Sequence, residues 1–361
     1  MAASRVSDRL DIQSHASVYT VTFDDGALER LDAGVAPGLH FLIDARVAGL
    51  YEGALTSVLA SPSVLLIEAS EASKSLDRFP AYVDHLVARG VRRNHTLVAV
   101  GGGVLQDITC FLAATLLRGL PWQFYPTTLL AQADSCIGSK SSINVGRLKN
   151  VLGTFTPPTA VWIADPVLRT LAGQDIRSGV GEMLKVHAIE GPDSFDRIAG
   201  DYARLLDDVG VRRRYVYRSL EIKKRLIEQD EFDRGVRNIM NYGHSFGHAI
   251  ESATNFAVPH GIAVTMGMDM ANYVSAQLGV GARKHFERMH KPLALNFAGF
   301  EGADIPEGAF LAALSHDKKN TDQQFTVILP DHDARIGRYT RSNDAAFRSA
   351  CRRYLAEGRT R

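Results

Sequence analysis

The sequence predicts a two-domain protein, in which an α/β nucleotide-binding domain with a mostly parallel sheet precedes a mostly α-helical domain. The chain has 361 residues, and two domains of roughly 150 to 200 residues each account for that length better than one core does. Up to residue 164, short apolar runs alternate with amphipathic stretches, and beyond residue 165 the pattern is almost entirely helical. We therefore expect domains at 1–165 and 166–361.

Composition excludes several classes of function. Hydrophobic residues make up 45% and charged residues 22% of the chain, and the net charge is +1, so we expect a protein that binds neither nucleic acid nor a membrane surface. The longest apolar stretch, 111–117, is too short to span a bilayer. The three cysteines show no CxxC spacing, and residues 1–15 contain no signal-like apolar run. These features predict a reducing compartment, the cytoplasm.

Three short apolar runs in the first half are typical of buried strands. They cover residues 39–43, 64–67 and 96–100, and an amphipathic stretch at 75–90 lies between the second and the third. In an open parallel sheet, ligands bind at the carboxyl ends of the strands. We therefore expect binding residues at Asp44, within 68–74 and at 101–103.

A triple glycine follows the third run. Gly101, Gly102 and Gly103 precede a helix that begins near Val104, so bare backbone N–H groups can approach a pyrophosphate at the helix N-terminus. The motif is not GxGxxG, and a tight turn without a ligand is the alternative. Asp107, one turn into the helix, either contacts a ribose or nicotinamide amide or complements the helix dipole.

A second polar stretch follows a strand-like run that ends near residue 126. It contains Asp134, Lys140, Asn144, Lys149 and Asn150, with hydroxyl residues between apolar positions. Lysines and amides in this density are typical of an anion pocket. A solvated loop has the same composition, so both interpretations stand at this point.

The second half is predicted to be helical at 194–207, 213–230, 244–254 and 260–278. We expect one strand there, at 325–329, and a frayed basic tail at 352–361.

Three histidines and one glutamate of this half indicate a metal site. His244 and His248 stand at i and i+4, so a helix places them on one face, and His260 opens the next helix. A surface or capping pair is the alternative interpretation of two such histidines. Glu182 shares a helix face with Lys185. Glu182, His244 and His260 would form a two-histidine, one-carboxylate site that leaves room for substrate or water, as a catalytic divalent metal requires.

Specific motifs occur in one order along the chain. They are Gly101-Gly-Gly-Val-Leu-Gln-Asp107, Pro126-Thr-Thr-Leu-Leu-Ala-Gln-Ala-Asp134, Lys140 with Asn144, Lys149-Asn150, Gly181-Glu-Met-Leu-Lys185, Asn241-Tyr-Gly-His-Ser-Phe-Gly-His248, His260-Gly261 and Asp317-Lys-Lys319. With these motifs the chain resembles the sugar phosphate cyclase family from about residue 44 to 338, and it is most similar to the 3-dehydroquinate synthase branch.

The resemblance implies a lyase that uses NAD and a divalent metal, Zn or Co. In this family NAD⁺ oxidises a ring hydroxyl, phosphate is eliminated, NADH returns the hydride, and the opened sugar closes to a carbocycle by an aldol step. The implied substrate is a heptulosonate 7-phosphate, and the implied assembly is a homodimer.

The resemblance also assigns residues. The implied metal ligands are Glu182, His244 and His260. Those around NAD are Asp44, Glu71, Lys74, Gly102, Gly103, Val104, Asp107, Thr127 and Thr128. Lys140, Asn150, Asn241, His248 and Lys319 match substrate and phosphate contacts. Asp134, Lys149 and Lys185 match other polar residues of the pocket, and Lys140, Asp134 and Lys149 are also assigned to the cofactor. Lys223 and Arg237 match the pair that meets the substrate carboxylate, and Arg118 matches an arginine presented to the neighbouring subunit.

Several positions depart from the family pattern and indicate a divergent branch. Gln106 replaces a glycine, Ser141-Ser142 replace Thr-Gly, Asp233 replaces a glutamate, Ile262 replaces a glutamate, and Arg46 replaces an asparagine. The alternative substrate is sedoheptulose 7-phosphate, used by valiolone-type cyclases of secondary metabolism. Those branches often replace the residues that correspond to Asn241 and His248, and both are kept here, which favours the dehydroquinate branch. A metal-dependent polyol dehydrogenase and a non-catalytic homologue are the alternatives from other classes.

Overall fold

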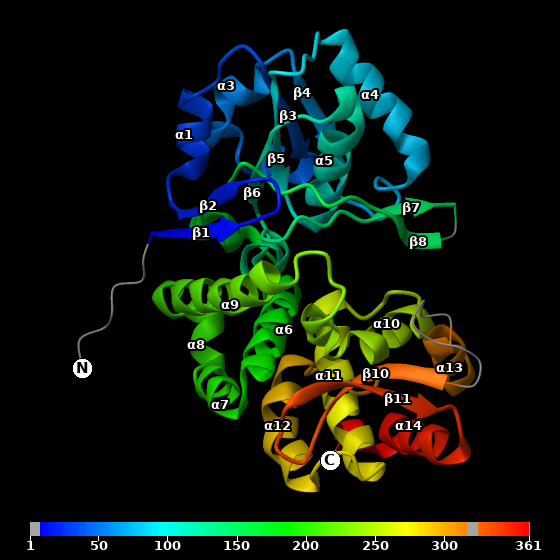
Figure 1. Cartoon of the computed structure of the whole chain (residues 1–361). Helices are drawn as coiled ribbons and strands as arrows, with labels where there is room; N and C mark the ends of the chain where they lie inside the picture. The colour runs from blue at the N-terminus through cyan, green and yellow to red at the C-terminus, as the bar shows by residue number, and fades with distance from the viewer. Residues whose placement is uncertain (1–7, 147, 316–323, 361) are drawn as a thin grey trace. The chain divides into compact units, whose positions relative to one another are not determined.

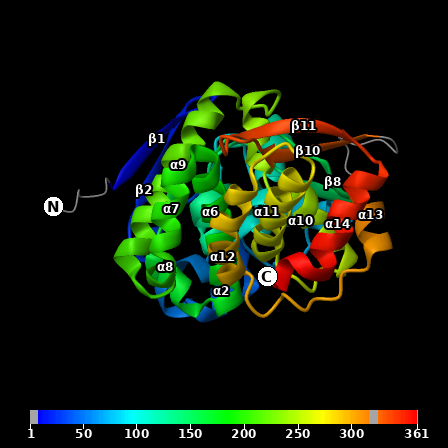
Figure 2. The same ribbon diagram turned by 90° about the horizontal axis from the view of Figure 1, so that it is seen from below.

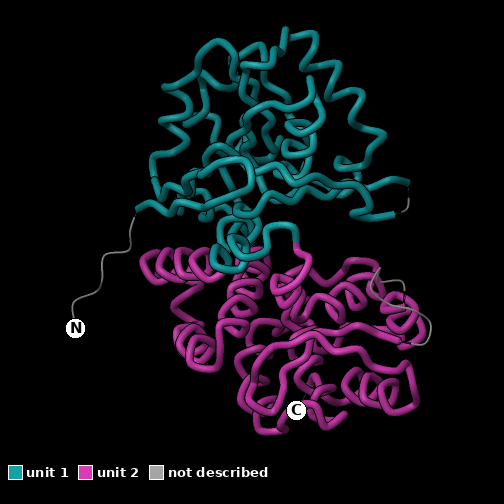
Figure 3. The backbone as a smooth tube through the Cα atoms, viewed as in Figure 1, with its two compact units in different colours: residues 1–172, 223–232 teal, residues 173–222, 233–361 magenta. Residues whose placement is uncertain are grey.

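The computed structural model describes residues 8–146, 148–315 and 324–360 (Figure 1). The chain forms two compact units. The first comprises Met1–Ala172 and Lys223–Phe232, and the second comprises Gly173–Ile222 and Asp233–Arg361 (Figure 3). The first unit thus includes a short segment from the second half of the sequence, which the domain prediction at 1–165 did not include.

The first unit is built on a sheet with flanking helices. Its strands are β1 (Arg9–Gln13), β2 (Val18–Phe23), β3 (Leu39–Asp44), β4 (Val64–Ile67), β5 (Thr96–Gly101), β6 (Trp122–Pro126), β7 (Ile143–Val145), β8 (Leu148–Leu152) and β9 (Ala160–Ile163). Its helices are α1 (Ala27–Ala33), α2 (Ala45–Leu50), α3 (Thr56–Leu59), α4 (Phe79–Ala88) and α5 (Gly103–Thr115), with the π-helix η4 (Ala131–Ser135) and the 3₁₀ turns η1 (Glu52–Ala54), η2 (Leu76–Arg78), η3 (Leu116–Arg118) and η5 (Asp165–Thr170).

Seven strands form one sheet in the order β1-β2-β9-β6-β5-β3-β4. Every neighbouring pair is parallel except β1 with β2. This confirms the predicted mostly parallel sheet. The three predicted strands are β3, β4 and β5, and their central residues are apolar without alternation because β3 and β5 are buried along their inner lengths.

The strand order creates a switch point between β3 and β5. From β3 the chain moves outward to β4, and then it returns to form β5 on the other side of β3. In such sheets the crevice for a ligand lies outside the carboxyl ends of the two strands where the direction reverses. Asp44 ends β3 and Gly101 ends β5, so the glycine turn lies at this point.

The second unit is helical. It contains α6 (Gly173–Glu190), α7 (Pro192–Gly200), α8 (Tyr202–Asp207), most of α9 (Val209–Gln229), α10 (His244–Ala253), α11 (His260–Gln277), α12 (Arg283–Asn296), α13 (Glu307–Ser315) and α14 (Ala345–Glu357), with the 3₁₀ turns η6 (Val236–Asn241) and η7 (Gly358–Thr360) and the strands β10 (Gln324–Pro330) and β11 (Ile336–Ser342). The fold class is therefore confirmed, with an α/β unit followed by a mostly α-helical unit.

Helix α11 is the centre of the second unit. It is buried on all sides from Gly261 to Ser275, as expected for a helix whose apolar residues do not form a single stripe. Helices α6, α10, α12 and α14 pack against it, and Figure 2 shows α10 and α14 on one side of α11.

Two expectations about the second unit were wrong. The strand expected at 325–329 is β10, but it pairs with a second strand, β11, whose sequence IGRYTRS is too polar to read as a buried strand. The tail expected to fray, residues 352–361, forms the last six residues of α14 and the turn η7, and Tyr354 within it is fully buried. Only one face of α14 is apolar, and the arginines between its buried residues make the segment look like a solvated tail in the sequence.

Two further features concern the surroundings of the protein. No helix in the described ranges is long and apolar enough to cross a membrane. Cys110, Cys136 and Cys351 are all buried and unpaired.

Candidate functional site

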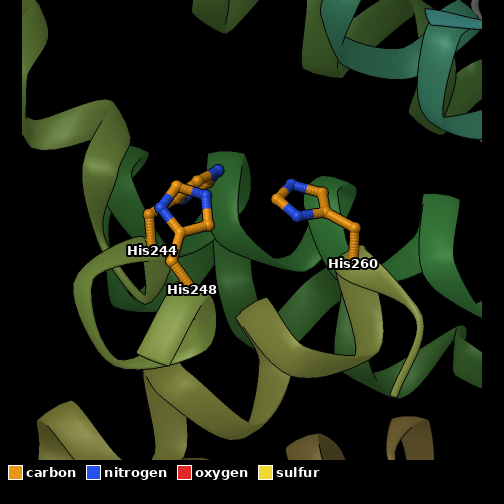
Figure 4. Close-up of side chains that lie close together, drawn as sticks. All are labelled: His244, His248 and His260. Atoms are coloured by element: carbon orange, nitrogen blue, oxygen red, sulfur yellow. The ribbon is translucent and has the colours of Figure 1, made fainter. Parts of the chain in front are cut away.

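Three imidazoles of the second unit face one another (Figure 4). The ligand atoms of His244, His248 and His260 all lie within 4.8 Å of one another. Their ring centroids are 5.3 to 5.6 Å apart. The first two belong to the first two turns of α10, and the third begins α11. The i,i+4 spacing therefore brings two histidines to a common centre, and the next helix supplies the third.

Glu182 brings a carboxylate to the same centre. Its Oε1 lies 3.6 Å from Nε2 of His244 and 3.4 Å from Nε2 of His260. Its other oxygen forms an ion pair with Lys185, one turn further along α6. Both side chains are almost completely buried. The residues predicted as metal ligands therefore lie together, with a buried ammonium beside them.

Glycines allow α6, α10 and α11 to approach closely enough for this contact. A Cβ added to Gly261 would lie 1.9 Å from the carbonyl oxygen of Ser178, and one added to Gly181 would lie 2.2 Å from the carbonyl oxygen of Gly261. Any side chain at either position would separate α6 from α11. Because Gly181 precedes Glu182 and Gly261 follows His260, this packing brings the carboxylate next to the imidazole.

The charges of the cluster affect one another strongly. Burial by itself would raise the pKa of Glu182, but Lys185 and the two nearby histidines hold it well below its usual range. Burial and the positive charge of Lys185 lower the pKa of His244. Burial also acts to lower the pKa of His260, but the neighbouring carboxylates of Glu182 and Glu251 outweigh it and raise this pKa to about 10. The carboxylate is therefore ionised, and His244 is neutral.

The donor set fits a divalent cation. Neither carboxylate oxygen of Glu182 accepts a hydrogen bond of normal geometry from the described residues, although both atoms are buried. A buried carboxylate without hydrogen bonds is unfavourable unless a positive charge compensates it. One carboxylate oxygen and imidazole nitrogens at one centre are ligands that Zn²⁺ and Co²⁺ accept. The geometry includes His248 among the possible ligands, whereas the sequence analysis assigned it to the substrate.

Glu251 also belongs to this cluster, although it was not among the residues predicted from the sequence. Glu251 accepts a hydrogen bond from Nδ1 of His260 at 3.1 Å, and it lies on α10 one turn after His248. A carboxylate on the second ring nitrogen fixes the tautomer, so that Nε2 faces the centre. The i,i+3 spacing from His248 is a signal in the sequence that could have found it.

In the first unit, the glycine turn joins β5 to α5 as predicted. Gly102 caps α5, and no side chain of the described residues bonds to the first N–H groups of this helix. A Cβ added to Gly103 would meet no atom within 4 Å. Gly101 pairs with Pro126 of β6, so Thr127 and Thr128 end beside the turn. Uncapped N–H groups beneath open space suit a pyrophosphate.

Asp44, Arg46 and Val104 lie at the same edge of the sheet. Asp44 caps α2 and accepts a hydrogen bond from the backbone N–H of Arg46 at 2.9 Å. Val104 belongs to the first turn of α5. An arginine in place of the family's asparagine at position 46 is therefore compatible with the helix cap, because the hydrogen bond to Asp44 comes from the backbone N–H of this residue.

Lys74 joins several of the residues predicted for the cofactor. Its ammonium lies 3.0 Å from Oδ2 of Asp107, 3.1 Å from Oδ1 of Asn150 and 3.5 Å from Oε1 of Glu71. Asn144 donates to Glu71 at 3.0 Å and accepts from the backbone N–H of Asn150 at 2.9 Å. The polar stretch is thus neither a loose loop nor a set of separate side chains, because the hairpin β7–β8 holds it against Lys74.

The interactions of this network shift the pKa values of its two carboxyl groups in opposite directions. Burial raises the pKa of Asp107, and the nearby ammonium of Lys74 offsets part of that effect. Burial acts in the same direction on Glu71, but Lys74, Asn144 and Lys149 together lower its pKa below the usual value. Asp107 therefore has an ion-pair role that neither interpretation of its position in the helix included.

Lys223 also has a partner in the first unit. Its ammonium lies 2.8 Å from Oδ1 of Asp134, which belongs to the π-helix η4. The resemblance pairs Lys223 with Arg237, and Arg237 belongs to the second unit, where it is buried in η6. Asn241 ends the same turn.

The remaining predicted residues lie at less regular positions. Lys140 precedes β7 and forms a β-bridge with Phe155. Lys149 lies in β8, 3.8 Å from Glu71. Arg118 is exposed in η3, where Leu117 and Arg118 both have positive φ, at 52° and 67°. Lys319 lies outside the described residues.

Comparison with known proteins agrees with this arrangement. Residues 64–178 match the family model of the 3-dehydroquinate synthase N-terminal domain, and residues 179–320 match that of the 3-dehydroquinate synthase C-terminal domain. The chain is 35% identical over 338 residues to a 3-dehydroquinate synthase of Cereibacter sphaeroides, with 89% of this chain and 91% of the relative covered.

Two solved structures share the fold. A 2-deoxy-scyllo-inosose synthase complexed with carbaglucose-6-phosphate, NAD⁺ and Co²⁺ superposes with a TM-score of 0.84 at 20% identity, over 95% of this chain and 99% of that chain. A 2-epi-5-epi-valiolone synthase from Streptomyces hygroscopicus with NAD⁺ and Zn²⁺ bound gives a TM-score of 0.80 at 27% identity, over 97% and 99%. From the two family models and the curated relative, the chain belongs to the 3-dehydroquinate synthase family.

Proposed function

We propose that the protein is a sugar phosphate cyclase of the 3-dehydroquinate synthase type, which converts a heptulosonate 7-phosphate into a carbocycle with elimination of phosphate. It uses NAD and a divalent metal, as do the two structural relatives with bound cofactors. The observation that carries the proposal is the buried carboxylate of Glu182, which lies within 3.6 Å of the imidazoles of His244 and His260 and beside the ammonium of Lys185.

Glu182, His244 and His260 would hold the cation, and the glycine turn with Thr127 and Thr128 would hold the nucleotide. When bound, the cation supplies Lewis acidity to a substrate oxygen, and NAD⁺ supplies reversible removal of a hydride. The residues of the chain position the cation and balance its charge. The ionised Glu182 adds negative charge to the metal centre, and Lys185 stabilises that carboxylate from the side away from the imidazoles.

Recognition of a substrate acid group supports the dehydroquinate branch. Arg237 can donate two parallel N–H bonds to a carboxylate, and Lys223 adds a second positive charge. Both side chains are buried, which strengthens a charged hydrogen bond from either one to a carboxylate. Lys140 and Asn150, in and beside the hairpin β7–β8, would bind the phosphate group that leaves the substrate.

A valiolone-type cyclase is the second candidate. The 27% identity to a 2-epi-5-epi-valiolone synthase over nearly the whole chain supports this candidate. The departures from the family pattern at Gln106 and Ile262 support it as well. That branch acts on sedoheptulose 7-phosphate, which carries a neutral hydroxymethyl group in place of the carboxylate.

One experiment separates the candidates. The purified protein, supplied with NAD⁺ and Zn²⁺ or Co²⁺, is given 3-deoxy-arabino-heptulosonate 7-phosphate and sedoheptulose 7-phosphate separately, and any carbocycle is identified by NMR. We expect product and free phosphate from the first sugar without net formation of NADH. Product from the second sugar alone would identify the valiolone type, and NADH formed in proportion to product would identify a dehydrogenase.

We also propose a homodimer in which Arg118 serves the partner's site. The exposed position of Arg118 on a turn with two positive-φ residues supports this, because such a conformation is unfavourable unless it serves a contact. Mixing inactive Arg118→Ala and Lys140→Ala subunits should restore part of the activity in hybrid dimers. Exchange of subunits without any recovery would contradict the shared site.

The three buried, unpaired cysteines support a cytoplasmic location.

A further inference from the structure

Gln106 makes two hydrogen bonds to one residue. It lies on α5 next to Asp107, and its side chain is almost completely buried. Its Nε2 donates to the carbonyl oxygen of Ser135 at 2.6 Å, and its Oε1 accepts from the hydroxyl of Ser135 at 2.6 Å. Both ends of the amide are therefore used, and a glycine, which the family pattern has at this position, could make neither bond.

Ser135 is the last residue of the π-helix η4 (Ala131–Ser135). A π-helical turn is wider and less stable than an α-helical turn, so it needs support from outside its own backbone. At its beginning, Thr128 accepts a hydrogen bond from the N–H of Ala131 at 3.2 Å. From its middle, Gln132 donates to the carbonyl oxygens of Pro126 and Ala164 at 3.1 and 2.8 Å. Gln106 supplies the contacts to its end.

The residue held between these supports is Asp134. Its carboxylate lies 2.8 Å from the ammonium of Lys223, and both side chains are mostly buried, with 14% and 8% of their surfaces exposed. A buried ammonium takes its position from the carboxylate next to it, because leaving that charge uncompensated is costly. A shift of Ser135 therefore moves Asp134, and with it the charge of Lys223.

We propose that Gln106 is a positioning residue for substrate recognition, which acts through Ser135 and Asp134 to fix the ammonium of Lys223. This rests on the proposed function, in which Lys223 binds the carboxylate of the substrate. The chain thereby stabilises the carboxylate-binding lysine with an amide that the family pattern lacks.

The test removes the hydrogen bonds and keeps the volume. In Gln106→Met we expect KM for 3-deoxy-arabino-heptulosonate 7-phosphate to rise about tenfold, the size of effect that one or two hydrogen bonds produce. In Ser135→Ala we expect a smaller rise, because the backbone carbonyl of this residue still accepts from Nε2 of Gln106. We expect kcat to change less than about threefold, and the Kd of NAD⁺ to stay the same. The double variant should resemble Gln106→Met, since that single variant already removes the hydrogen bond that Ser135→Ala removes. Ser135→Thr keeps the hydroxyl and should restore most of the wild-type KM.

A matched control comes from the second unit. Ser194 is buried, and its hydroxyl bonds to His187 and Glu190 at 2.8 Å each. Ser194→Ala should lower the Tm by an amount similar to Ser135→Ala without changing KM. An unchanged KM in Gln106→Met, or a fully additive double variant, would overturn the proposal.

A second measurement does not depend on turnover. Acetic anhydride labelling followed by peptide mass spectrometry reports how accessible each lysine is. In Gln106→Met, acetylation of Lys223 should become several-fold faster, while Lys74, which is buried beside Asp107, keeps its rate. An unchanged rate at Lys223 would overturn the positioning role. Faster labelling in a protein that converts neither sugar would leave the positioning role standing and refute the proposed function.

Discussion

The two units satisfy their charged residues in different ways. In the first unit, the ammonium of Lys74 lies beside the carboxylates of Asp107 and Glu71 and the amide of Asn150. The nucleotide would meet a turn of bare backbone there. In the second unit, Glu182 has one cation beside it and no normal hydrogen bond among the described residues. The polar groups of the first arrangement are paired by neighbouring side chains, whereas the carboxylate of the second depends on nearby positive charge, which Lys185 supplies and a bound cation would increase. Removing ligand residues should therefore affect metal content far more than it affects the fold.

The largest expected effect is at the metal centre. His260→Ala should lose bound metal and lower kcat/KM by about a thousandfold or more, because the cation provides the Lewis acid. Metal analysis of the purified variants and circular dichroism measure both parts. His248→Ala is the matched control, since the sequence analysis assigns this exposed histidine to the substrate. Full metal content in His260→Ala, or its loss in His248→Ala, would show that the ligand set is different.

A smaller effect is expected at the guanidinium of Arg237. Arg237→Leu should lower kcat/KM for the carboxylate sugar about a hundredfold, or about 3 kcal/mol of transition-state stabilisation, since a bidentate charged contact is lost. Arg212→Leu provides the comparison, because Arg212 is equally buried but donates to the carbonyl oxygens of Leu205 and Leu206. Equal losses in both variants would mean that Arg237 has a structural role only.

Glu251 tests the contribution of a residue behind the metal ligands. Glu251→Gln should weaken metal binding about tenfold, since the carboxylate no longer holds the Nδ1 proton of His260. Titration of the metal-free protein with Zn²⁺ measures the change. Wild-type affinity in this variant would indicate that His260 is oriented by packing alone.

The last expected effect is on stability instead of activity, and it depends on pH. Burial lowers the pKa of His187 to about 4, below the value of about 6.5 expected in the unfolded chain. The unfolded state therefore binds more protons between these values, so the free energy of unfolding should fall as the pH decreases from about 6.5 to 4, by at most about 3 kcal/mol from this group. Urea unfolding at several pH values measures it, and His187→Gln should flatten the dependence. The same slope in the variant would assign the effect to other groups.

Local periodicity in the sequence was enough to predict the fold class and part of the site. Residues 39–43, 64–67 and 96–100 were predicted as strands from their apolar runs, and they are β3, β4 and β5. The runs of β3 and β5 do not alternate because these two strands are buried along their inner lengths. The spacing of His244 and His248 placed two imidazoles on one face of α10, because side chains four residues apart on a helix are neighbours. These features depend on residues within one or two turns of one another.

Only the tertiary structure decided which distant groups meet. The contact of Glu182 with His260 depends on glycines that bring α6 against α11. The pair of Lys223 with Asp134 joins helix α9 to a π-helix 89 residues earlier. Neither follows from periodicity, because a pattern fixes the face on which a side chain lies and not the element that packs against that face. The strand β11 and the helix α14 were missed for the same reason, since their apolar sides are defined by β10 and α11.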